Sequence, residues 1–314
     1  MCVCGPSVSV LPRHEAGNNR QSAAPAMNVR KAVITAAGVH QRVLPLQVLI
    51  DRDGIEKPIL RILLEEVFAA PIEEACVIIA PGDRASYSRA AGDLVQRVQF
   101  IEQPSPGGYA QAVFCARSFT GNDPFLHLVG DHVYLGNSHG RPACRLVALA
   151  EREDCAVSSV QPTRENHIGH YGVVGGQPVA GRPELYRVEV VKEKPTPTEA
   201  EEHLIVPGLR AGYYLCFFGM HVLTAGVMDL IEHGLRIEDT RVTLSGVLNQ
   251  LARREQYLAL EESNRRYDVG VRYGLLTAQM ALALTGSDRE QVLANLLELL
   301  ATRAMEDPVG PNPR

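Results

Sequence analysis

The chain has 314 residues, of which 46% are hydrophobic and 21% charged, and its formal net charge at pH 7 is −5. This composition is typical of a globular protein, and the length suits a single large α/β domain. The negative charge argues against a general nucleic-acid-binding protein, which would carry a basic surface. No apolar run reaches the roughly 18 residues that span a bilayer, so we expect no membrane partner and a cytoplasmic location.

Seven cysteines are scattered along the chain, and several of them lie inside apolar runs. No C-x-x-C pair has a matching partner, so neither a zinc site nor a redox motif is indicated. We therefore expect reduced thiols that pack as small hydrophobic side chains.

The predicted elements begin after residue 27. Residues 1–27 are rich in Ser, Pro, Asn and Ala and lack periodicity, which indicates a disordered tail or, with Met27 as the true start, an upstream extension. Strands are expected at 32–36, 75–80, 98–101, 124–128 and 156–160, and helices at 58–68, 85–95, 108–117 and 141–152. This alternation predicts a doubly wound, mostly parallel sheet of Rossmann-like type, with every strand end and hence the site on one side.

The pattern changes after residue 161. Strands at 171–174 and 185–191 are separated by Gly and Pro residues, which indicates an inserted β-rich part rather than a further βαβ unit. A strand at 211–218, helices at 220–233 and 243–253 and a strand at 257–260 follow, and helices at 271–284 and 289–305 end the chain. We place one domain at 28–285 and a carboxy-terminal helix and tail at 286–314. The last helix is apolar on more than one face, so a homo-oligomer is one expectation.

Five segments with residues suited to binding or catalysis follow predicted elements. They are KAVITAAGVHQR at 31–42, QPSPGGYAQAV at 103–113, Asp131 after a buried strand, KEKP at 192–195 and YDVG at 267–270. Carboxylates and glycines at the carboxyl ends of parallel strands lie where ligands and metals bind. Each segment alone also has an ordinary interpretation as a turn, a helix cap or a solvated charge cluster. The chain has no H-E-x-x-H zinc motif, G-x-S-x-G elbow or P-loop spacing.

Taken in order, these segments resemble the UTP–glucose-1-phosphate uridylyltransferase family of sugar-phosphate nucleotidylyltransferases. The family's AAG-x-G-T-R stands here as AAGVHQR, and its Q-G-x-x-x-G-x-G-H-A-V stands as QPSPGGYAQAV. A metal-binding Asp after a strand matches Asp131, and YGVV, V-x-E-K-P and D-x-G match residues 171–174, 191–195 and 268–270. The resemblance covers residues 31 to 284.

The resemblance implies a transferase that joins UTP and glucose 1-phosphate, or a related sugar 1-phosphate, into a UDP-sugar and pyrophosphate with Mg²⁺ as cofactor. Such chemistry depends on positioning and on neutralising developing charge. The matched positions would take these roles: Asp131 and Asp268 for the metal, Arg42 and Lys194 for phosphates, Ala37, Gly38, Gln103 and Gly108 for the uracil, and Gly172 and Glu193 for the sugar, with Arg42, Asp131 and Lys194 as the catalytic set.

The phosphate loop departs from the family pattern. His40 replaces a glycine and Gln41 a threonine, and the lysine of a P-K-x-x-L-P segment corresponds to Gln47, with Lys57 further along the chain. A side chain at a glycine position restricts the backbone and crowds phosphates that bind to its N–H groups. These departures leave a second interpretation open, a non-catalytic relative that binds a nucleotide or nucleotide sugar and acts as a regulator or scaffold. A third is a transferase for another sugar or nucleotide.

Overall fold

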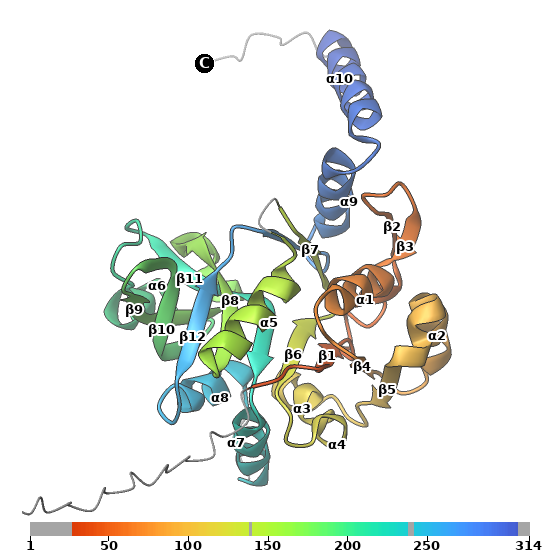
Figure 1. The fold of residues 1–314 in the computed structure, drawn as a ribbon. Helices are drawn as coiled ribbons and strands as arrows, with labels where there is room; N and C mark the ends of the chain where they lie inside the picture. Colours follow the sequence, from red (N-terminus) through yellow and green to blue (C-terminus); the bar gives the residue numbers. More distant parts are fainter. Residues whose placement is uncertain (1–26, 138–139, 238–241, 307–314) are drawn as a thin grey trace, which may run out of the picture.

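The fold is known from a computed structural model that describes residues 27–137, 140–237 and 242–306 (Figure 1). A central sheet carries helices on both faces, so the predicted α/β class is confirmed. Apart from Met27, the tail predicted at 1–27 lies outside the described residues.

The elements are as follows. The strands are β1 (Lys31–Thr35), β2 (Val48–Ile50), β3 (Glu56–Pro58), β4 (Glu74–Ile79), β5 (Val98–Glu102), β6 (Phe125–Val129), β7 (His132–Leu135), β8 (Ala156–Arg164), β9 (Gly172–Val179), β10 (Arg182–Glu193), β11 (Tyr213–Leu223), β12 (Tyr257–Glu261) and β13 (Arg265–Asp268). The helices are α1 (Ile59–Ala69), α2 (Arg84–Ala91), α3 (Tyr109–Phe114), α4 (Arg117–Thr120), α5 (Pro142–Glu153), α6 (Pro197–His203), α7 (Ala225–Arg236), α8 (Leu244–Leu251), α9 (Gly274–Thr285) and α10 (Arg289–Glu306).

The main sheet has nine strands in the order β5-β4-β1-β6-β11-β8-β12-β10-β9. Seven of them run in one direction, and β10 and β11 run in the opposite one. An extra pairing of β9 with β11 closes the β-rich half into a ring of five strands. The strands predicted at 171–174 and 185–191 form the antiparallel pair β9–β10, as the glycines between them indicated.

Two hydrophobic cores lie on opposite faces of the sheet. Ala32 and Ile34 of β1 pack in the core that contains α1 and α5, whereas Val33 packs in the core that contains α3, α7 and α8. Because both faces of the strand are covered, the residues that point to either face are apolar. The strand is therefore a continuous hydrophobic run in the sequence. β1 and β6 are paired in parallel within this sheet, so their carboxyl ends lie side by side.

The helix predicted at 220–233 begins later than expected. Residues 220–223 continue β11, where Met220 is the register partner of Leu128 on β6, and the helix α7 starts at Ala225. Gly219 has a φ of 83°, and the β11–β8 register shifts between Phe217 and His221. A strand buried on both faces lacks the alternation that distinguishes it from a buried helix, so periodicity assigned these four residues wrongly.

Two antiparallel pairs were not predicted. β2 pairs with β3, and β7 pairs with β13, so Asp268 ends a strand instead of lying in a simple turn before a helix. Strands of three or four residues give too short a pattern to be recognised in a sequence.

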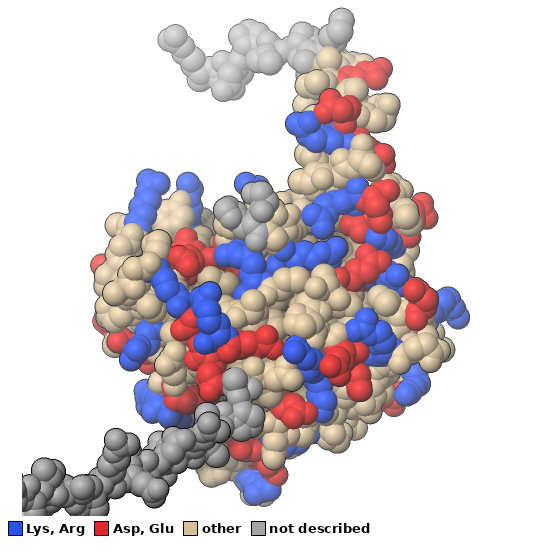
Figure 2. Space-filling model, viewed as in Figure 1, with Lys and Arg blue, Asp and Glu red and all other residues tan. Residues whose placement is uncertain are grey.

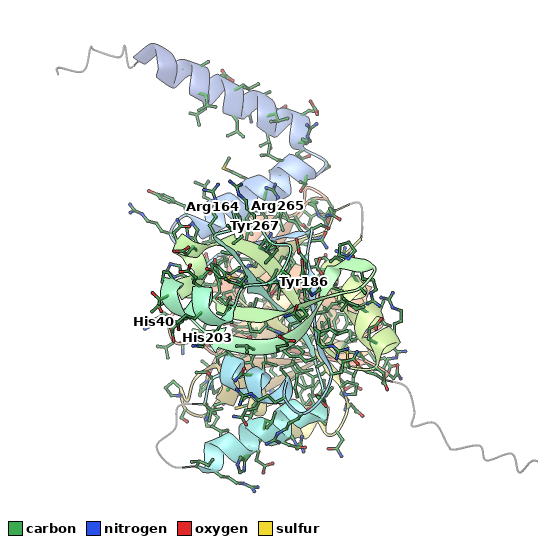
Figure 3. All side chains as sticks on the ribbon, turned by 90° about the vertical axis from the view of Figure 1, so that its left-hand side faces the viewer. His40, Arg164, Tyr186, His203, Arg265 and Tyr267 are labelled. Carbon is green, nitrogen blue, oxygen red and sulfur yellow. The ribbon has the colours of Figure 1, made fainter. Side chains whose placement is uncertain are left out.

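The helix α10 packs against α9 and projects from the body of the protein in both ribbon views (Figures 1 and 3). Leu297, Leu299 and Leu300 on it are exposed. Basic and acidic side chains are interspersed over the face drawn in Figure 2, without a large field of one sign. None of the described helices has the length and apolar character that a bilayer crossing requires.

Candidate active site

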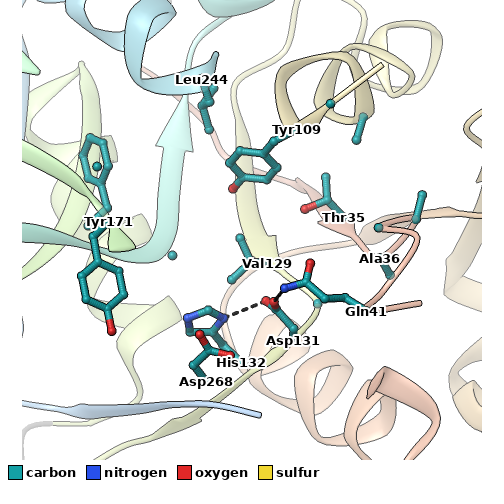
Figure 4. Close-up of a pocket in the computed structure, with 18 of the residues that line it drawn as sticks. Thr35, Ala36, Gln41, Tyr109, Val129, Asp131, His132, Tyr171, Leu244 and Asp268 are labelled. Atoms are coloured by element: carbon teal, nitrogen blue, oxygen red, sulfur yellow. Dashed lines mark hydrogen bonds and ion pairs between the residues drawn. The ribbon is translucent and has the colours of Figure 1, made fainter. Parts of the chain in front are cut away.

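A cavity of about 460 Å³ opens beyond the carboxyl ends of β1 and β6 (Figure 4). Its walls also include residues from β9, β10, β11 and α8. Of the ten residues predicted for the site, eight line this cavity: Ala37, Gly38, Gln103, Gly108, Asp131, Gly172, Glu193 and Asp268. The structure therefore brings together in one volume residues that are up to 231 positions apart in the sequence (37 to 268).

The loop after β1 forms one wall of the cavity. The backbone N–H groups of Gln41 and Arg42 both donate to the carbonyl of Gly38, at 2.9 and 2.8 Å, which turns the chain sharply after the strand. The Tyr87 hydroxyl donates to the Arg42 carbonyl at 2.7 Å and fixes the end of the turn.

Arg42 does not line the cavity. Its guanidinium Nε lies 3.5 Å from Asp83 Oδ2, and 44% of its side chain is exposed. His40 is also exposed and lies at the edge of the molecule in Figure 3. The role of Arg42 at a triphosphate stays a prediction.

The segment from Gln103 to Gly108 forms a second wall. Gln103 follows β5 and is buried, and its Nε2 donates to Gln111 Oε1 at 2.5 Å and to the Gly108 carbonyl at 3.3 Å. Gly108 has a φ of 96°, a conformation that glycine adopts at low cost. These contacts hold Gly108 immediately before α3 and leave the Oε1 oxygen of Gln103 available to a ligand.

Three metal-ligating side chains gather at one end of the cavity. Asp131, His132 and Asp268 each offer one ligand atom, and these atoms lie within 4.8 Å of one another. The pairing of β7 with β13 makes His132 and Asp268 register partners. Gly130 packs so closely on β1 that a Cβ there would lie 2.8 Å from the Thr35 carbonyl oxygen. This close packing fixes the position of the next residue, Asp131.

The Asp131 carboxylate is already engaged at both oxygens (Figure 4). Its Oδ1 lies 2.8 Å from Nδ1 of His132, and its Oδ2 accepts a hydrogen bond of 2.6 Å from the Gln41 amide. Burial raises the pKa of this carboxyl, but the hydrogen bond and charge of His132, with a further contribution from Arg266, outweigh it and hold the pKa below its usual range. The group is therefore ionised at neutral pH.

This donor set fits a divalent cation. Two carboxylates face each other, Asp131 is ionised, and the buried Nε2 of His132 has no hydrogen-bond partner among the described residues. Mg²⁺ prefers carboxylate and phosphate oxygens over nitrogen. Asp131 and Asp268 are thus the natural ligands for it, and His132 is placed to orient Asp131, as partners of metal ligands commonly do.

The opposite end of the cavity is built on β9 and β10. Gly172 and Glu193 are register partners, and the Ser245 hydroxyl of α8 donates to Glu193 Oε2 at 2.5 Å. A Cβ on Gly172 would lie 2.5 Å from the Ser245 Oγ and 2.6 Å from the Phe217 ring. A side chain there would force Ser245 or Phe217 to move, and the carboxylate beside Gly172 is oriented toward the cavity by the Ser245 hydroxyl.

Lys194 follows β10 but does not line the cavity. Its φ is 46°, and its N–H donates to the Tyr171 carbonyl at 2.9 Å, so the side-chain alternation of the strand does not extend to it. Its predicted contact with a phosphate stays untested.

Comparison with known proteins identifies the family. A family model described as nucleotidyl transferase matches residues 31–284. The chain belongs to the nucleotidyl transferase family. The resemblance inferred from the motifs is confirmed at this level, over the same residues.

Relatives of the nucleotidyl transferase cover most of the chain. A UTP–glucose-1-phosphate uridylyltransferase of Streptococcus pneumoniae is 27% identical over 305 residues, which are 88% of this chain and 98% of the relative. A Streptococcus pyogenes protein named UTP–glucose-1-phosphate uridylyltransferase 1 is 26% identical over 298 residues, 86% of this chain and 93% of that one.

Solved structures share the fold. A UDP-glucose pyrophosphorylase complexed with UDP-glucose has a TM-score of 0.66 at 18% identity and covers 81% of this chain and 98% of its own. A UTP-bound UGPase from Acinetobacter baumannii has a TM-score of 0.66 at 20% identity and covers 86% and 99%.

Several cavity residues of the nucleotidyl transferase were not predicted. His132 and Arg266 line the cavity, the first next to Asp131 and the second next to a tyrosine, but neither has a sequence signal of its own. Ser245 was expected only as part of a helix. Each of these side chains reaches the cavity through a tertiary contact: Arg266 lies 4.5 Å from the centre of the Tyr171 ring and donates to the Phe217 carbonyl at 2.5 Å.

The position of the family's phosphate-binding lysine is polar but uncharged. Gln47 is exposed and donates to the Val43 carbonyl at 3.3 Å. Lys57 does not replace the lysine, because its ammonium binds Asp51, Asp53 and Glu65 at 2.6 to 2.9 Å, outside the cavity.

Proposed function

We propose that this nucleotidyl transferase joins UTP and glucose 1-phosphate to give UDP-glucose and pyrophosphate. The observation that carries the proposal is that one cavity holds both the Asp131–Asp268 pair and the Gly172–Glu193 pair. The names of the streptococcal relatives and the UTP and UDP-glucose bound to proteins of the same fold support this choice of substrates.

The uracil would lie between the two loops that follow β1 and β5. Ala37 and Gly38 present a backbone with little side-chain bulk, so a flat ring can approach closely. Gln103 would offer its free Oε1 as an acceptor and Gly108 its backbone. The uracil would thus be recognised by hydrogen bonds and by packing against a largely apolar wall.

The sugar phosphate would bind at the other end. Glu193, held by Ser245, would accept hydrogen bonds from sugar hydroxyls, and the close packing at Gly172 would let the ring approach the backbone. In this arrangement the phosphate of the sugar would point toward Asp131 and Asp268, where the triphosphate would also lie.

In the reaction, an oxygen of the sugar phosphate would attack the α-phosphorus of UTP, and the bond to pyrophosphate would break. A bound Mg²⁺ would supply neutralisation of the phosphate charge at this point. The chain itself would align the two substrates. The carboxylates of Asp131 and Asp268 would hold the metal end, and the Gly172–Glu193 pair would hold the sugar. Alignment of two anions accounts for most of the catalysis that such a reaction needs. Arg42 would reach the phosphates by turning away from Asp83, and Lys194 by turning its side chain into the cavity.

A second candidate function is a non-catalytic protein that binds a nucleotide sugar and regulates or scaffolds a partner. The hydrogen bond from the Gln41 amide to Asp131 favours it, because an N–H donor occupies an oxygen that a cation would need. A transferase acting on a different sugar or nucleotide is the third. The predicted homo-oligomer, the domain limits and the cytoplasmic location remain proposals beside these.

A pyrophosphate-release assay with UTP, glucose 1-phosphate and Mg²⁺ tests the leading proposal. We expect turnover by the wild type that disappears in Asp131→Ala. Turnover no higher than that of Asp131→Ala, across several sugar phosphates and nucleotides, would exclude the enzyme.

Calorimetry distinguishes the second candidate. Tight binding of UDP-glucose without turnover would favour it. Gain of activity in a His40→Gly, Gln41→Thr, Gln47→Lys triple variant would also show that the loop substitutions had removed catalysis.

A further inference from the structure

A second polar zone lines the cavity beside the groups described above. Tyr109 reaches into the cavity near Leu244, on the side away from Asp268 (Figure 4). His221, from the middle of the sheet, lines the same volume although it is 2% exposed. Neither residue takes part in the contacts proposed above for the uracil, the metal or the sugar.

A chain of buried hydrogen bonds decides where His221 carries its proton. Ser158 Oγ lies 2.6 Å from His221 Nδ1 and 2.5 Å from the Tyr257 hydroxyl, and Ser158 and Tyr257 are both buried. Among the described residues, Ser158 is the only partner of the Tyr257 hydroxyl. Because a buried proton is rarely left unpaired, Tyr257 donates it to Ser158. The Ser158 proton has no described partner other than Nδ1, so Ser158 donates to Nδ1, which makes Nδ1 an acceptor.

A neutral imidazole that accepts at Nδ1 has its proton on Nε2. Burial lowers the pKa of His221 to about 3, so the ring is neutral at physiological pH. No described residue pairs with Nε2 of His221. The ring therefore presents an unpaired N–H donor on the wall of the cavity.

Tyr109 is held by the neighbouring strand. His127 on β6, the register partner of His221, has Nδ1 3.5 Å from the Tyr109 hydroxyl and Nε2 3.4 Å from Thr35 Oγ1. The His127 and His221 rings are 5.7 Å apart at an interplanar angle of 31°. Burial holds the pKa of His127 well below the usual histidine value, so this ring is neutral too and links the Tyr109 hydroxyl to Thr35.

The chemistry of these groups selects the kind of ligand atom. A neutral N–H and a phenol both offer hydrogen bonds to an oxygen, and the proposed function places the phosphates at the metal end, so the oxygen that reaches this zone belongs to a neutral part of the ligand. His221 packs edge-on against Phe217, with ring centres 5.0 Å apart, and Phe217 borders Gly172. Tyr109 follows Gly108 at the other end. The zone therefore lies between the proposed uracil and sugar positions.

We propose that the Nε2–H of His221 and the hydroxyl of Tyr109 form a hydrogen-bonding subsite for a ring hydroxyl of the bound nucleotide sugar. The hydroxyl belongs either to the ribose or to the transferred sugar. Ser158 and Tyr257 are positioning residues that hold the imidazole in the donor tautomer. This inference rests on the proposed function, because it requires a nucleotide sugar in the cavity.

Calorimetry with three ligands in the presence of Mg²⁺ tests the subsite: UDP-glucose, UTP and 2′,3′-dideoxy-UTP. His221→Phe keeps the ring contacts and removes the N–H, and Tyr109→Phe removes only the hydroxyl. We expect each variant to bind UDP-glucose about 10-fold more weakly, since it leaves a ligand hydroxyl without its partner. A ribose hydroxyl predicts the same loss with UTP but none with the dideoxy compound. A hydroxyl of the transferred sugar predicts a loss with UDP-glucose alone.

His203→Phe, on α6 and outside the cavity, is the matched control (Figure 3). Unchanged affinity for UDP-glucose in both cavity variants, or an equal loss with all three ligands, would overturn the subsite. A wild type that binds none of the ligands would instead overturn the proposed function, and the subsite with it.

The tautomer has its own test, which needs no ligand and does not depend on the His221 variant folding. The ¹⁵N chemical shifts of His221 in the wild type should show a protonated Nε2 and an acceptor Nδ1, and Ser158→Ala should produce a mixture of the two tautomers. A proton on Nδ1 in the wild type would contradict the inference.

Discussion

The metal end and the sugar end of the cavity are built in different ways. At the sugar end, Gly172 and Glu193 are register partners on adjacent strands, and one hydroxyl orients the carboxylate. At the metal end, Asp131 and Asp268 are 137 positions apart (131 to 268) and meet because the short strands β7 and β13 pair. The metal end also contains Gln41, whose amide competes for the carboxylate.

The difference shows which part of the site can change without loss of the fold. The sugar end is part of the main sheet, so a change there disturbs both stability and binding. At the metal end Asp131 follows β6 of the main sheet, but Asp268 lies on the two-stranded β7–β13 pair, and Gln41, on a loop, belongs to neither core. We expect substitutions at the two ends to separate binding of the sugar from binding of the cation.

Asp131→Asn should have the largest effect. It preserves the shape of the side chain but removes the charge that a divalent cation needs, so we expect turnover to fall by about 1,000-fold or more. Pyrophosphate release measures turnover, and electron paramagnetic resonance with Mn²⁺ measures ion binding. Asp123→Asn, an exposed carboxylate paired with Lys31, is the control. Full Mn²⁺ affinity in Asp131→Asn would place the ion elsewhere.

Gly172→Ala should disturb the sugar end next. The added Cβ would overlap Ser245 and Phe217, which costs about 1–3 kcal/mol of stability when the neighbours must move. We expect a lower melting temperature and roughly 10-fold weaker binding of UDP-glucose, with Mn²⁺ affinity unchanged. Gly169→Ala is a matched control, because nothing lies within 4 Å of a Cβ there. Equal behaviour of the two variants would show that the close packing at Gly172 is relieved without cost.

Gln41→Thr should act on the metal end in the opposite direction. It removes a hydrogen bond to a charged oxygen, an interaction worth about 1–2 kcal/mol, so we expect Mn²⁺ to bind about 5- to 30-fold more tightly. Gln47→Thr, outside the cavity, should leave Mn²⁺ affinity unchanged. Weaker Mn²⁺ binding in Gln41→Thr would mean that the Gln41 amide turns its oxygen toward the ion and serves as a ligand.

Ser245→Ala should give the smallest change. Glu193 would lose its fixed donor and become free to turn, so the KM for glucose 1-phosphate should rise by about 3- to 5-fold while the KM for UTP stays constant. Steady-state kinetics measure both values. Ser287→Ala, an exposed hydroxyl outside this cavity, is the control. A matching rise in the KM for UTP would show that the contact supports the whole cavity rather than the sugar end.

The sequence was sufficient for the outline of the site, since eight of the ten residues chosen from motifs line one cavity. Glycines and carboxylates directly after buried strands are informative because the strands are parallel and their ends converge. Arg42 and Lys194 were less predictable. Both carry long side chains on turns, and a motif places the backbone of such a residue without deciding its partner. In the fold, Arg42 faces Asp83.

What the sequence determined by itself was the α/β class, the strand ends that carry the site and the family. These follow from local patterns: apolar runs long enough for buried strands, and polar residues at fixed offsets after them. The tertiary structure alone decided that residues 220–223 extend β11, that β7 and β13 bring His132 beside Asp268, and that Gln41 reaches Asp131. Each of these depends on a contact between segments far apart in the chain, and no local pattern encodes which of several suitable partners a strand or side chain will meet.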